Sequence, residues 1–483
     1  MDSDNNTTNN QFGGEPSAQP TEPQPTIEQP AAQPAPAPQP IPQPASAQPM
    51  PQPAQQPQPA QPSIEPAKDQ SKKTNKLAII LGAVVGVLLI ATITLLVVTN
   101  LPTNTNGNNS NDSSSESTEP TDDQPEDSDN TPTENTELSS GSVTTTIGGK
   151  SITYSGAYVV DGIEATISSG TYESTTDDQV VFLVINGGSL TISGEVTVNK
   201  TGSSDFRGQG DDYSFYGTNS AIVVVGEDSS ATINGATITT NVSGANAVVA
   251  TNSGEVTIKN SNITTSSNNS RGLHATYDGD IDADTVTITT AGGSCASLAT
   301  DRGAGTVTAT NMTLSTAGAG SPLIYSTGDI TVTNSTGTAT GAQIAVVEGK
   351  NSITLDNCDF SANGIGNRIS VDNAGIMIYQ SMSGDASVGT GSFTAKNSTF
   401  TILSSSSVYT TAPFFFITNT EATINLTDVK ANFYPDGYFI LASGTDEWGK
   451  SGSNGGTVTI TATGLEASNQ NIGVDEISNV TGL

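Results

Sequence analysis

The sequence predicts an all-β protein dominated by a parallel β-helix, preceded by one transmembrane helix and by disordered N-terminal and linker segments. Three observations carry this prediction: a phrase that returns about every 24 residues, one long uncharged apolar run, and two polar stretches without a core pattern. Gly, Ser, Thr and Asn dominate the chain, and Val and Ile come in short bursts. Such a composition favours strands and turns over packed helices.

The first segment, residues 1–76, is rich in Pro and Gln, as in QPAPAPQPIPQP, and has almost no apolar pattern. It cannot bury a core, so we expect it to be disordered. Residues 99–140 carry ten acidic side chains and no basic one. Low hydrophobicity and mutual repulsion predict that this second polar segment is an extended, disordered tether.

Between the two polar segments lies LAIILGAVVGVLLIATITLLVV, Leu77–Val98, an apolar run without a single charge. Its length suffices for a helix that crosses a bilayer, and its distance from the start of the chain favours an uncleaved anchor over a signal peptide. Four lysines shortly precede the run, and the next basic residue is Lys150. The positive-inside rule therefore predicts a cytoplasmic N-terminus and an extracellular segment after the span.

The repeated phrase occupies residues 141–483. Its aligned copies, named by the number of their first residue, are ATING at 231, VTIKN at 256, IDADT at 281, VTATN at 307, ITVTN at 330 and ITLDN at 353, so the interval between copies is nearly constant. Each unit holds three short bursts, such as VTIKN, SNITT and GLHAT, separated by turn residues. Short strands at this interval predict one coil of a parallel β-helix per unit, with each strand paired to its counterparts one coil away.

Alternation within the phrase predicts which side chains point into the coil. The expected inner stacks are Val256, Ile258, Val307, Ala309, Ile330, Val332, Ile353 and Leu355. The expected outer row is Thr257, Thr308, Thr331, Thr354, Thr394, Thr423 and Thr459. A structural ladder of Asn260, Asn311, Asn334, Asn357 and Asn397 ends the phrase, where Asn suits a left-handed corner and its amides can bond along the axis.

Three coils are longer than the others, over Thr191–Thr232, Thr354–Thr394 and Thr423–Thr459, and loops on a rigid repeat are where recognition usually occurs. We call these loops the first, second and third excursions. The first contains carboxylates that could bind calcium, the only cofactor the sequence suggests, and aromatic rings that could stack on sugars. These residues are Asp205, Asp211 and Asp212, and Tyr213, Phe215 and Tyr216. Alternatively, the aromatic residues simply tether a solvated loop.

The third excursion, NFYPDGYFILASGTDEWGKSGSNGG, adds Tyr434, Tyr438 and Trp448 as candidate binding residues. Trp448 is the only tryptophan of the chain, which suits an exposed contact, although it could instead cover the core.

A formal charge of −33 excludes a nucleic-acid binder on electrostatic grounds. The nearest candidates for catalytic acids, bases and cations are Arg271, His274 with Asp278, and the pair Asp301 and Arg302. Because each lies at a turn in a different coil, with no residue of the same kind one repeat away, the sequence favours solvated turn charges and no catalytic centre.

Several stretches, namely SGANAVVAT, GSPLIYSTGDITVTN, VVEGKNSITLDNCDF, MIYQSMSGDA and GSNGGTVT, resemble a family of bacterial cell-surface proteins with right-handed parallel β-helix repeats. The resemblance covers about residues 141–483. It implies a pectin-lyase-like fold and adhesin-like or carbohydrate-binding roles, without an established catalytic centre.

These observations together favour a single-span surface protein whose external β-helix is adhesive or binds carbohydrate. The alternatives are an extracellular polysaccharide lyase or hydrolase and a structural envelope spacer without a specific ligand. The sequence does not indicate an oligomeric state. We also expect either a cap within residues 465–483 or a shortened sequence, because an open last coil exposes strand edges.

Overall fold

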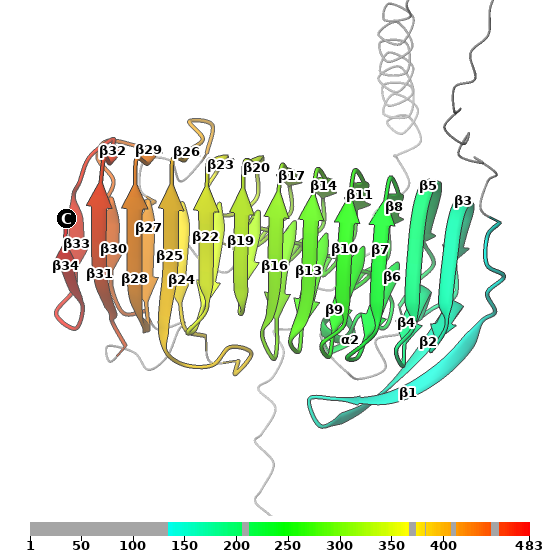
Figure 1. Cartoon of the computed structure of the whole chain (residues 1–483). Coiled ribbons are helices and arrows are strands. Elements are labelled where there is room, and N and C mark those ends of the chain that lie inside the picture. Colours follow the sequence, from blue (N-terminus) through cyan, green and yellow to red (C-terminus); the bar gives the residue numbers. More distant parts are fainter. Residues whose placement is uncertain (1–133, 205–211, 367–372, 382, 407–411, 446–453) are drawn as a thin grey trace, which may run out of the picture. The chain divides into compact units, whose positions relative to one another are not determined.

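The computed structural model describes residues 134–204, 212–366, 373–381, 383–406, 412–445 and 454–483. The predicted span Leu77–Val98, the Pro/Gln-rich segment and the tether up to residue 133 lie outside the described residues. In the described part of the chain, no helix is long and apolar enough to cross a membrane. That part is nearly all β, as predicted, and its strands form two long, mostly parallel sheets (Figure 1).

The first sheet, sheet A, has 13 strands, which follow one another along the coil axis. They are β1 (Gly141–Ile147), β2 (Lys150–Asp161), β4 (Gln179–Ile185), β6 (Ile222–Val225), β9 (Val248–Thr251), β12 (Leu273–Thr276), β15 (Leu298–Asp301), β18 (Ile324–Ser326), β21 (Ala345–Glu348), β24 (Ile376–Tyr379), β27 (Phe415–Thr418), β30 (Ile440–Ala442) and β33 (Ile472–Val474). Every neighbouring pair is parallel except β1 with β2.

Sheet B has 21 strands, arranged in two rows. The first row is β3 (Glu164–Ser174), β5 (Ser189–Lys200), β7 (Ser230–Asn234), β10 (Glu255–Lys259), β13 (Gly279–Asp284), β16 (Gly305–Thr310), β19 (Asp329–Thr333), β22 (Ser352–Asp356), β25 (Thr390–Lys396), β28 (Thr420–Thr427), β31 (Gly456–Thr463) and β34 (Asn479–Gly482). The second row is β8 (Thr237–Thr240), β11 (Asn262–Thr265), β14 (Thr287–Thr290), β17 (Thr313–Thr316), β20 (Thr336–Ala339), β23 (Asp359–Ala362), β26 (Thr399–Ile402), β29 (Lys430–Asn432) and β32 (Glu466–Ala467). Within residues 466–482, β32, β33 and β34 continue the stack by pairing with β29, β30 and β31.

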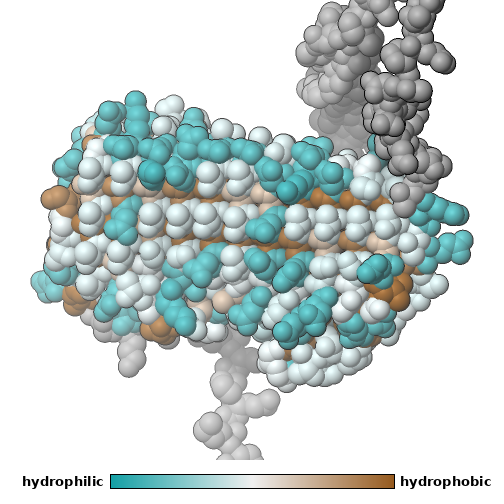
Figure 2. Space-filling view, viewed as in Figure 1, coloured by the Kyte–Doolittle hydropathy of each residue, from teal (hydrophilic) through white to brown (hydrophobic). Residues whose placement is uncertain are grey.

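The stacking of one coil on the next follows the predicted repeat. The bursts VTIKN, SNITT and GLHAT overlap β10, β11 and β12, and Val256 pairs with both Ala231 and Ile281 one coil away. Thr331 likewise pairs with Thr354, its counterpart in the following copy of the phrase. Each residue therefore lies beside its own counterpart, and side chains of similar hydropathy form rows that run across the strands (Figure 2).

The predicted inner residues form the core. All eight belong to one apolar cluster, and none is more than 3% exposed. The outer threonines are half-buried or exposed, also as predicted. The register of the last two outer threonines, Thr423 and Thr459, differs from the prediction. Thr423 pairs with Ser392, and Asn425 takes the predicted place beside Thr394. This two-residue offset keeps the face, since side chains alternate with a period of two.

The asparagine ladder is confirmed at all five predicted corners, where φ lies between 49° and 57°. The Asn357 amide donates to the Asn334 side-chain oxygen at 2.8 Å, and the Asn260 amide makes the same bond to Asn234. The Asn311 and Asn397 amides instead donate to aspartates one coil away, at 2.8 and 3.0 Å. One residue type thus satisfies both the backbone conformation of the corner and a bond to the next coil.

The N-terminal end of the coil stack differs from the expected uniform repeat. Gly148 and Gly149, both with positive φ, join β1 to β2 as an antiparallel hairpin. The tether boundary predicted after residue 140 is also wrong, because the chain contacts β3 from residue 135 onward. The Thr136 amide donates to the Thr166 carbonyl at 2.8 Å, and the Asn135 side-chain oxygen accepts from the Ser168 amide at 2.7 Å. These bonds cover the edge of the first coil, which would otherwise be unpaired.

Corner substitutions at Asn334 should rank in a fixed order of stability. Asn334→Gly should lower the urea midpoint modestly, because glycine tolerates the corner φ of 52° but cannot accept the Asn357 amide. Asn334→Ala should lower it further, by roughly 1–2 kcal/mol more in unfolding free energy, because alanine strains the left-handed backbone. Urea unfolding followed by circular dichroism measures both variants. An alanine variant as stable as the glycine variant would contradict this account of the corner.

Candidate functional site

Most of the predicted calcium ligands, and the tryptophan, lie outside the described residues. These are Asp205, Asp211 and Trp448, whereas Asp212 begins the short helix α2 (Asp212–Tyr216), where only its backbone is described. Among the described residues, no group of three or more His, Cys, Asp or Glu side chains could hold a metal ion. Calcium binding by the first excursion stays a prediction.

The aromatic residues of the first excursion face the coil instead of solvent. Tyr213, Phe215 and Tyr216 are only 5%, 6% and 1% exposed. The Tyr216 ring stacks on Tyr277, which lies just after β12, with 5.4 Å between ring centroids. Tyr213 and Tyr216 offer no open face for a sugar, contrary to the expected exposed platform, whereas Phe215 lines a pocket on sheet A. Their contacts fit the alternative in which they fasten the excursion to the coil.

Helix α2 is fastened by side chains that bond to its C-terminal carbonyls. The carbonyls of Ser214–Tyr216 accept, in chain order, from Asn246 Nδ2 at 2.7 Å, Thr276 Oγ1 at 2.9 Å and Tyr154 Oη at 2.7 Å. The last carbonyls of a helix have no partner within the helix, so donors at this end remove a desolvation cost. The first excursion is thereby held against the outer face of sheet A, the face directed away from the core.

The two described tyrosines of the third excursion differ in their exposure to solvent. Tyr434 is half-buried, and Tyr438 is 44% exposed. Among the described residues, Tyr438 is the only predicted binding residue that is exposed, and its role in binding stays a prediction.

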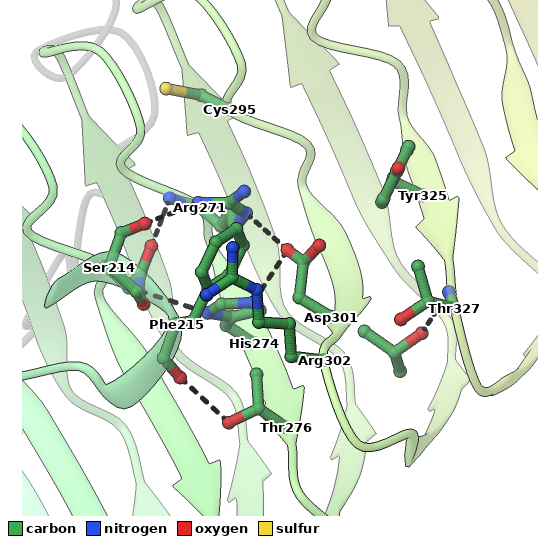
Figure 3. Close-up of polar contacts among 12 residues, drawn as sticks. Ser214, Phe215, Arg271, His274, Thr276, Cys295, Asp301, Arg302, Tyr325 and Thr327 are labelled. Carbon is green, nitrogen blue, oxygen red and sulfur yellow. Dashed lines mark hydrogen bonds and ion pairs between the residues drawn. The ribbon is translucent and has the colours of Figure 1, made fainter. Parts of the chain in front are cut away.

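Of the residues interpreted as solvated turn charges, His274 and Asp301 are in fact buried and meet the half-buried Arg271 on the outer face of sheet A (Figure 3), whereas Asp278 is exposed, as expected. His274 is 0% and Asp301 3% exposed. Asp301 Oδ2 lies 3.0 Å from His274 Nε2 and 3.0 Å from Arg271 Nε. The sequence paired His274 with Asp278, but the partner is Asp301. Strand alternation explains the meeting: Ala299 pairs with His274 in the next coil, and Asp301 is two residues further on the same face.

Hydrogen bonds fix the protonation state of His274. The Asn246 oxygen accepts from the Arg271 backbone amide at 2.8 Å, so the Asn246 amide nitrogen faces His274 Nδ1, 3.1 Å away. Nδ1 therefore accepts, and the ring proton on Nε2 is donated to Asp301. Burial lowers the pKa of His274, which agrees with a neutral ring. Burial alone would raise the pKa of Asp301, but Arg271 and His274 lower it, which keeps this carboxylate ionised.

Two guanidinium groups enclose the Phe215 ring. Arg302 lies over it at 4.2 Å from the ring centroid and Arg271 at 5.3 Å. Arg302 also forms an ion pair with Asp385 of the second excursion, with Nε and Oδ1 2.5 Å apart. Cation–π contacts and this ion pair thus connect the first and second excursions across the outer face of sheet A.

A second polar cluster surrounds Glu348, at the end of β21. Its Oε2 accepts from the hydroxyl groups of Tyr325 and Tyr379, and its Oε1 from Ser381 Oγ. Glu348 is 1% exposed, and burial raises its pKa although these three hydrogen bonds act in the opposite direction. The cluster fixes the orientation of both tyrosine rings.

A pocket with a volume of about 190 Å³ lies between these clusters. Its polar wall includes Arg271 and Asp301, and its apolar wall includes Phe215, Val346 and Met377. The rings of Tyr325 and Tyr379 and the carboxylate of Asp385 complete the part that bears on ligand binding. This arrangement of a few polar groups and an apolar wall is typical of small-molecule sites.

Sequence reasoning missed Tyr325, Glu348, Tyr379 and Asp385. A signal was available for the first three. Each is a polar residue in the third burst of a coil, where most residues that point toward either face of the sheet are apolar. The third burst is buried on both faces where the excursions cover sheet A, so an ionisable group there is exceptional. Asp385 carries no such signal, since it lies in an excursion without a repeat pattern.

The chain matches no protein-family model, no curated protein and no solved structure.

The neutral, buried state of His274 predicts a pH-dependent loss of stability. Because burial lowers its pKa below the ordinary 6.5, the unfolded chain takes up a proton at a pH where the folded chain does not. Unfolding free energy should therefore fall as the pH drops below about 6.5, by up to about 1.4 kcal/mol per pH unit from this group. Urea unfolding at a series of pH values measures the slope.

The matched control is His274→Gln, which keeps a hydrogen-bonding side chain but cannot titrate. Its stability should fall less than that of the wild type between pH 6.5 and 5.5. The raised pKa of Glu348 makes the unfolding free energy fall as the pH rises above the ordinary pKa of a glutamate side chain. This effect is the same in both proteins. Parallel pH profiles for the two proteins would contradict a neutral His274.

Proposed function

We propose that this protein is a membrane-anchored surface protein whose β-helix binds carbohydrate, and that the pocket on sheet A is the binding site. The single observation that carries the proposal is the pocket itself, whose lining combines the charged side chains of Arg271 and Asp301 with apolar and aromatic side chains. A pyranose ring has the matching character, since hydroxyl groups surround its edge and C–H groups cover its faces.

The rigidity of the pocket walls supports binding. Sheet A holds Asp301, Tyr325 and Val346 on three successive coils, so strand pairing sets the spacing of these side chains. Side chains held by a paired backbone and by hydrogen bonds lose little freedom on binding, which favours affinity.

The surface location rests on sequence alone. The uncharged apolar run Leu77–Val98, preceded by lysines and followed by an acidic stretch, supports a single span with a cytoplasmic N-terminus and an extracellular β-helix. The family resemblance adds a right-handed coil and an adhesin-like role to this proposal.

A specific observation favours a second candidate, a polysaccharide lyase or hydrolase acting at the same pocket. Burial raises the pKa of Glu348, whereas Arg271 and His274 lower that of Asp301 against the effect of burial. Two carboxyl groups whose surroundings separate their pKa values are the usual acid and base of glycoside hydrolysis. Both, however, are engaged in hydrogen bonds and nearly fully buried, which is why binding is preferred.

Filling the pocket should abolish glycan binding. Val346 lines the pocket and is 6% exposed, so Val346→Trp places an indole ring where the ligand would lie. Retention on a glycan array should fall at least ten-fold. The matched control is Thr257→Trp, on the outer face of β10 in sheet B, which should bind like the wild type. A structural spacer without a ligand would give no retention for the wild type either.

Release of reducing sugar separates binding from cleavage. The wild type should release no reducing ends from any neutral or acidic polysaccharide of a panel, with or without calcium. If reducing ends or unsaturated products accumulate, Glu348→Gln identifies their source, because it keeps the shape of the side chain and removes the acid. Turnover that this variant abolishes would replace the binding proposal with the enzymatic one.

A further inference from the structure

We infer that the pocket takes a neutral saccharide and holds two adjacent hydroxyl groups of it, one on the Asp301 carboxylate and one on the Arg271 guanidinium. This inference rests on the proposed glycan binding and specifies the class of ligand. Its basis is the ion pair of Arg271 and Asp301. Each of these side chains has a further polar atom that the described residues leave without a hydrogen-bond partner.

Asp301 has one oxygen free for a ligand. His274 and Arg271 both contact Oδ2, and within the described residues no hydrogen-bond donor reaches Oδ1. In Figure 3, this second oxygen lies on the side of Asp301 that faces Tyr325, and both residues line the pocket. An ionised carboxylate only accepts hydrogen bonds, so a ligand at Oδ1 must donate, as a sugar hydroxyl group does.

Arg271 supplies the complementary donors. Its Nε is bound to Asp301, and Nη1 lies 3.4 Å from Ser214 Oγ. Nη2 has no hydrogen-bond partner in the described part of the chain, and the side chain is 11% exposed where it lines the pocket. A guanidinium group only donates, so its partner in the ligand is the oxygen of a second hydroxyl group. Because its Nε is fixed to Asp301, donor and acceptor are held at one short separation, which suits hydroxyl groups on neighbouring carbons.

The charges of the pocket disfavour an acidic sugar. Arg271 is paired with Asp301, and Arg302 with Asp385, so each guanidinium near the pocket already has a carboxylate. A third carboxyl group, Glu348, lies behind the tyrosine rings. A uronic acid would place its carboxylate beside these groups, and the described residues supply no surplus positive charge to compensate it, which opposes binding.

The apolar wall determines how the ring lies. The hydroxyl groups of Tyr325 and Tyr379 are bound to Glu348, so these residues offer their rings to the pocket, next to Val346 and Met377. A sugar whose hydroxyl pair meets Arg271 and Asp301 would direct its C–H face to this wall. The hydroxyl pair supplies orientation, and the apolar wall supplies contact area.

Binding of matched sugars to the full-length chain in detergent tests the inference without changing the protein. The panel contains neutral oligosaccharides, the corresponding uronic acids, and deoxy analogues that lack one hydroxyl of a vicinal pair. We expect neutral ligands to bind at least ten-fold more tightly than the uronic acids. Loss of one hydroxyl should weaken binding about ten-fold or more, because it leaves a buried charged group unpaired. Affinity for the neutral ligand should change little with salt.

A protein variant provides the second arm. Asp301→Asn keeps the shape of the side chain but replaces the anionic acceptors, and it should weaken binding of the parent sugar about ten-fold or more. It should weaken binding of the deoxy analogue much less, a difference that a general loss of folding would not produce. Asp280→Asn, on the outer face of β13 in sheet B, is the matched control and should bind like the wild type.

The outcomes distinguish this inference from the function on which it rests. Tighter, salt-sensitive binding of uronic acids, or equal binding of the parent and deoxy sugars, would overturn the neutral-diol assignment and leave glycan binding intact. Binding that is unaffected by Val346→Trp would place the glycan elsewhere on the chain and overturn the pocket assignment. No binding of any glycan would overturn both.

Discussion

The pairing of each strand with its counterpart one coil away is the constraint on which the other features of this protein depend. Parallel pairing in register places equivalent residues side by side, so one apolar position repeated along the sequence becomes a continuous core. It also converts a constant spacing within the chain into a row of side chains on the surface. The asparagine corners reinforce the register, because they combine a left-handed backbone with amide bonds along the axis.

The same constraint explains how the pocket forms. A repeat that were perfectly regular would present only rows of identical residues and no concave site. Here the first and second excursions leave the register and then return to it, and their described residues contact the outer face of sheet A. Helix α2 is fixed there through its carbonyls, and Arg302 and Asp385 connect it with the second excursion. The rigid coil thus provides positions, while the excursions provide the walls.

The polar groups of the pocket are buried or half-buried, and they form hydrogen bonds and ion pairs with one another. Asn246, His274, Asp301 and Arg271 form a chain in which each hydrogen bond fixes the next, so the ring state of His274 follows from an amide 3.1 Å away. Such a network removes most of the cost of burying charges, and it leaves specific atoms available for a ligand. Asp301 Oδ1, which no donor among the described residues reaches, is one of these atoms, and it gives the proposed recognition its chemistry.

The sequence by itself determined the class of fold, the coil repeat, the inner and outer faces and the asparagine corners, because these features depend on periodicity that is visible along the chain. It also located the excursions. It did not determine the hairpin at the first coil or the contacts of residues 135–140, since covering an end depends on what that end leaves unpaired. Only the tertiary structure brought His274, Asp301 and Glu348 to one face, because alternation and coil register act jointly on residues from different coils. It also turned Phe215 inward, as the two guanidinium groups that enclose its ring come from coils later in the chain.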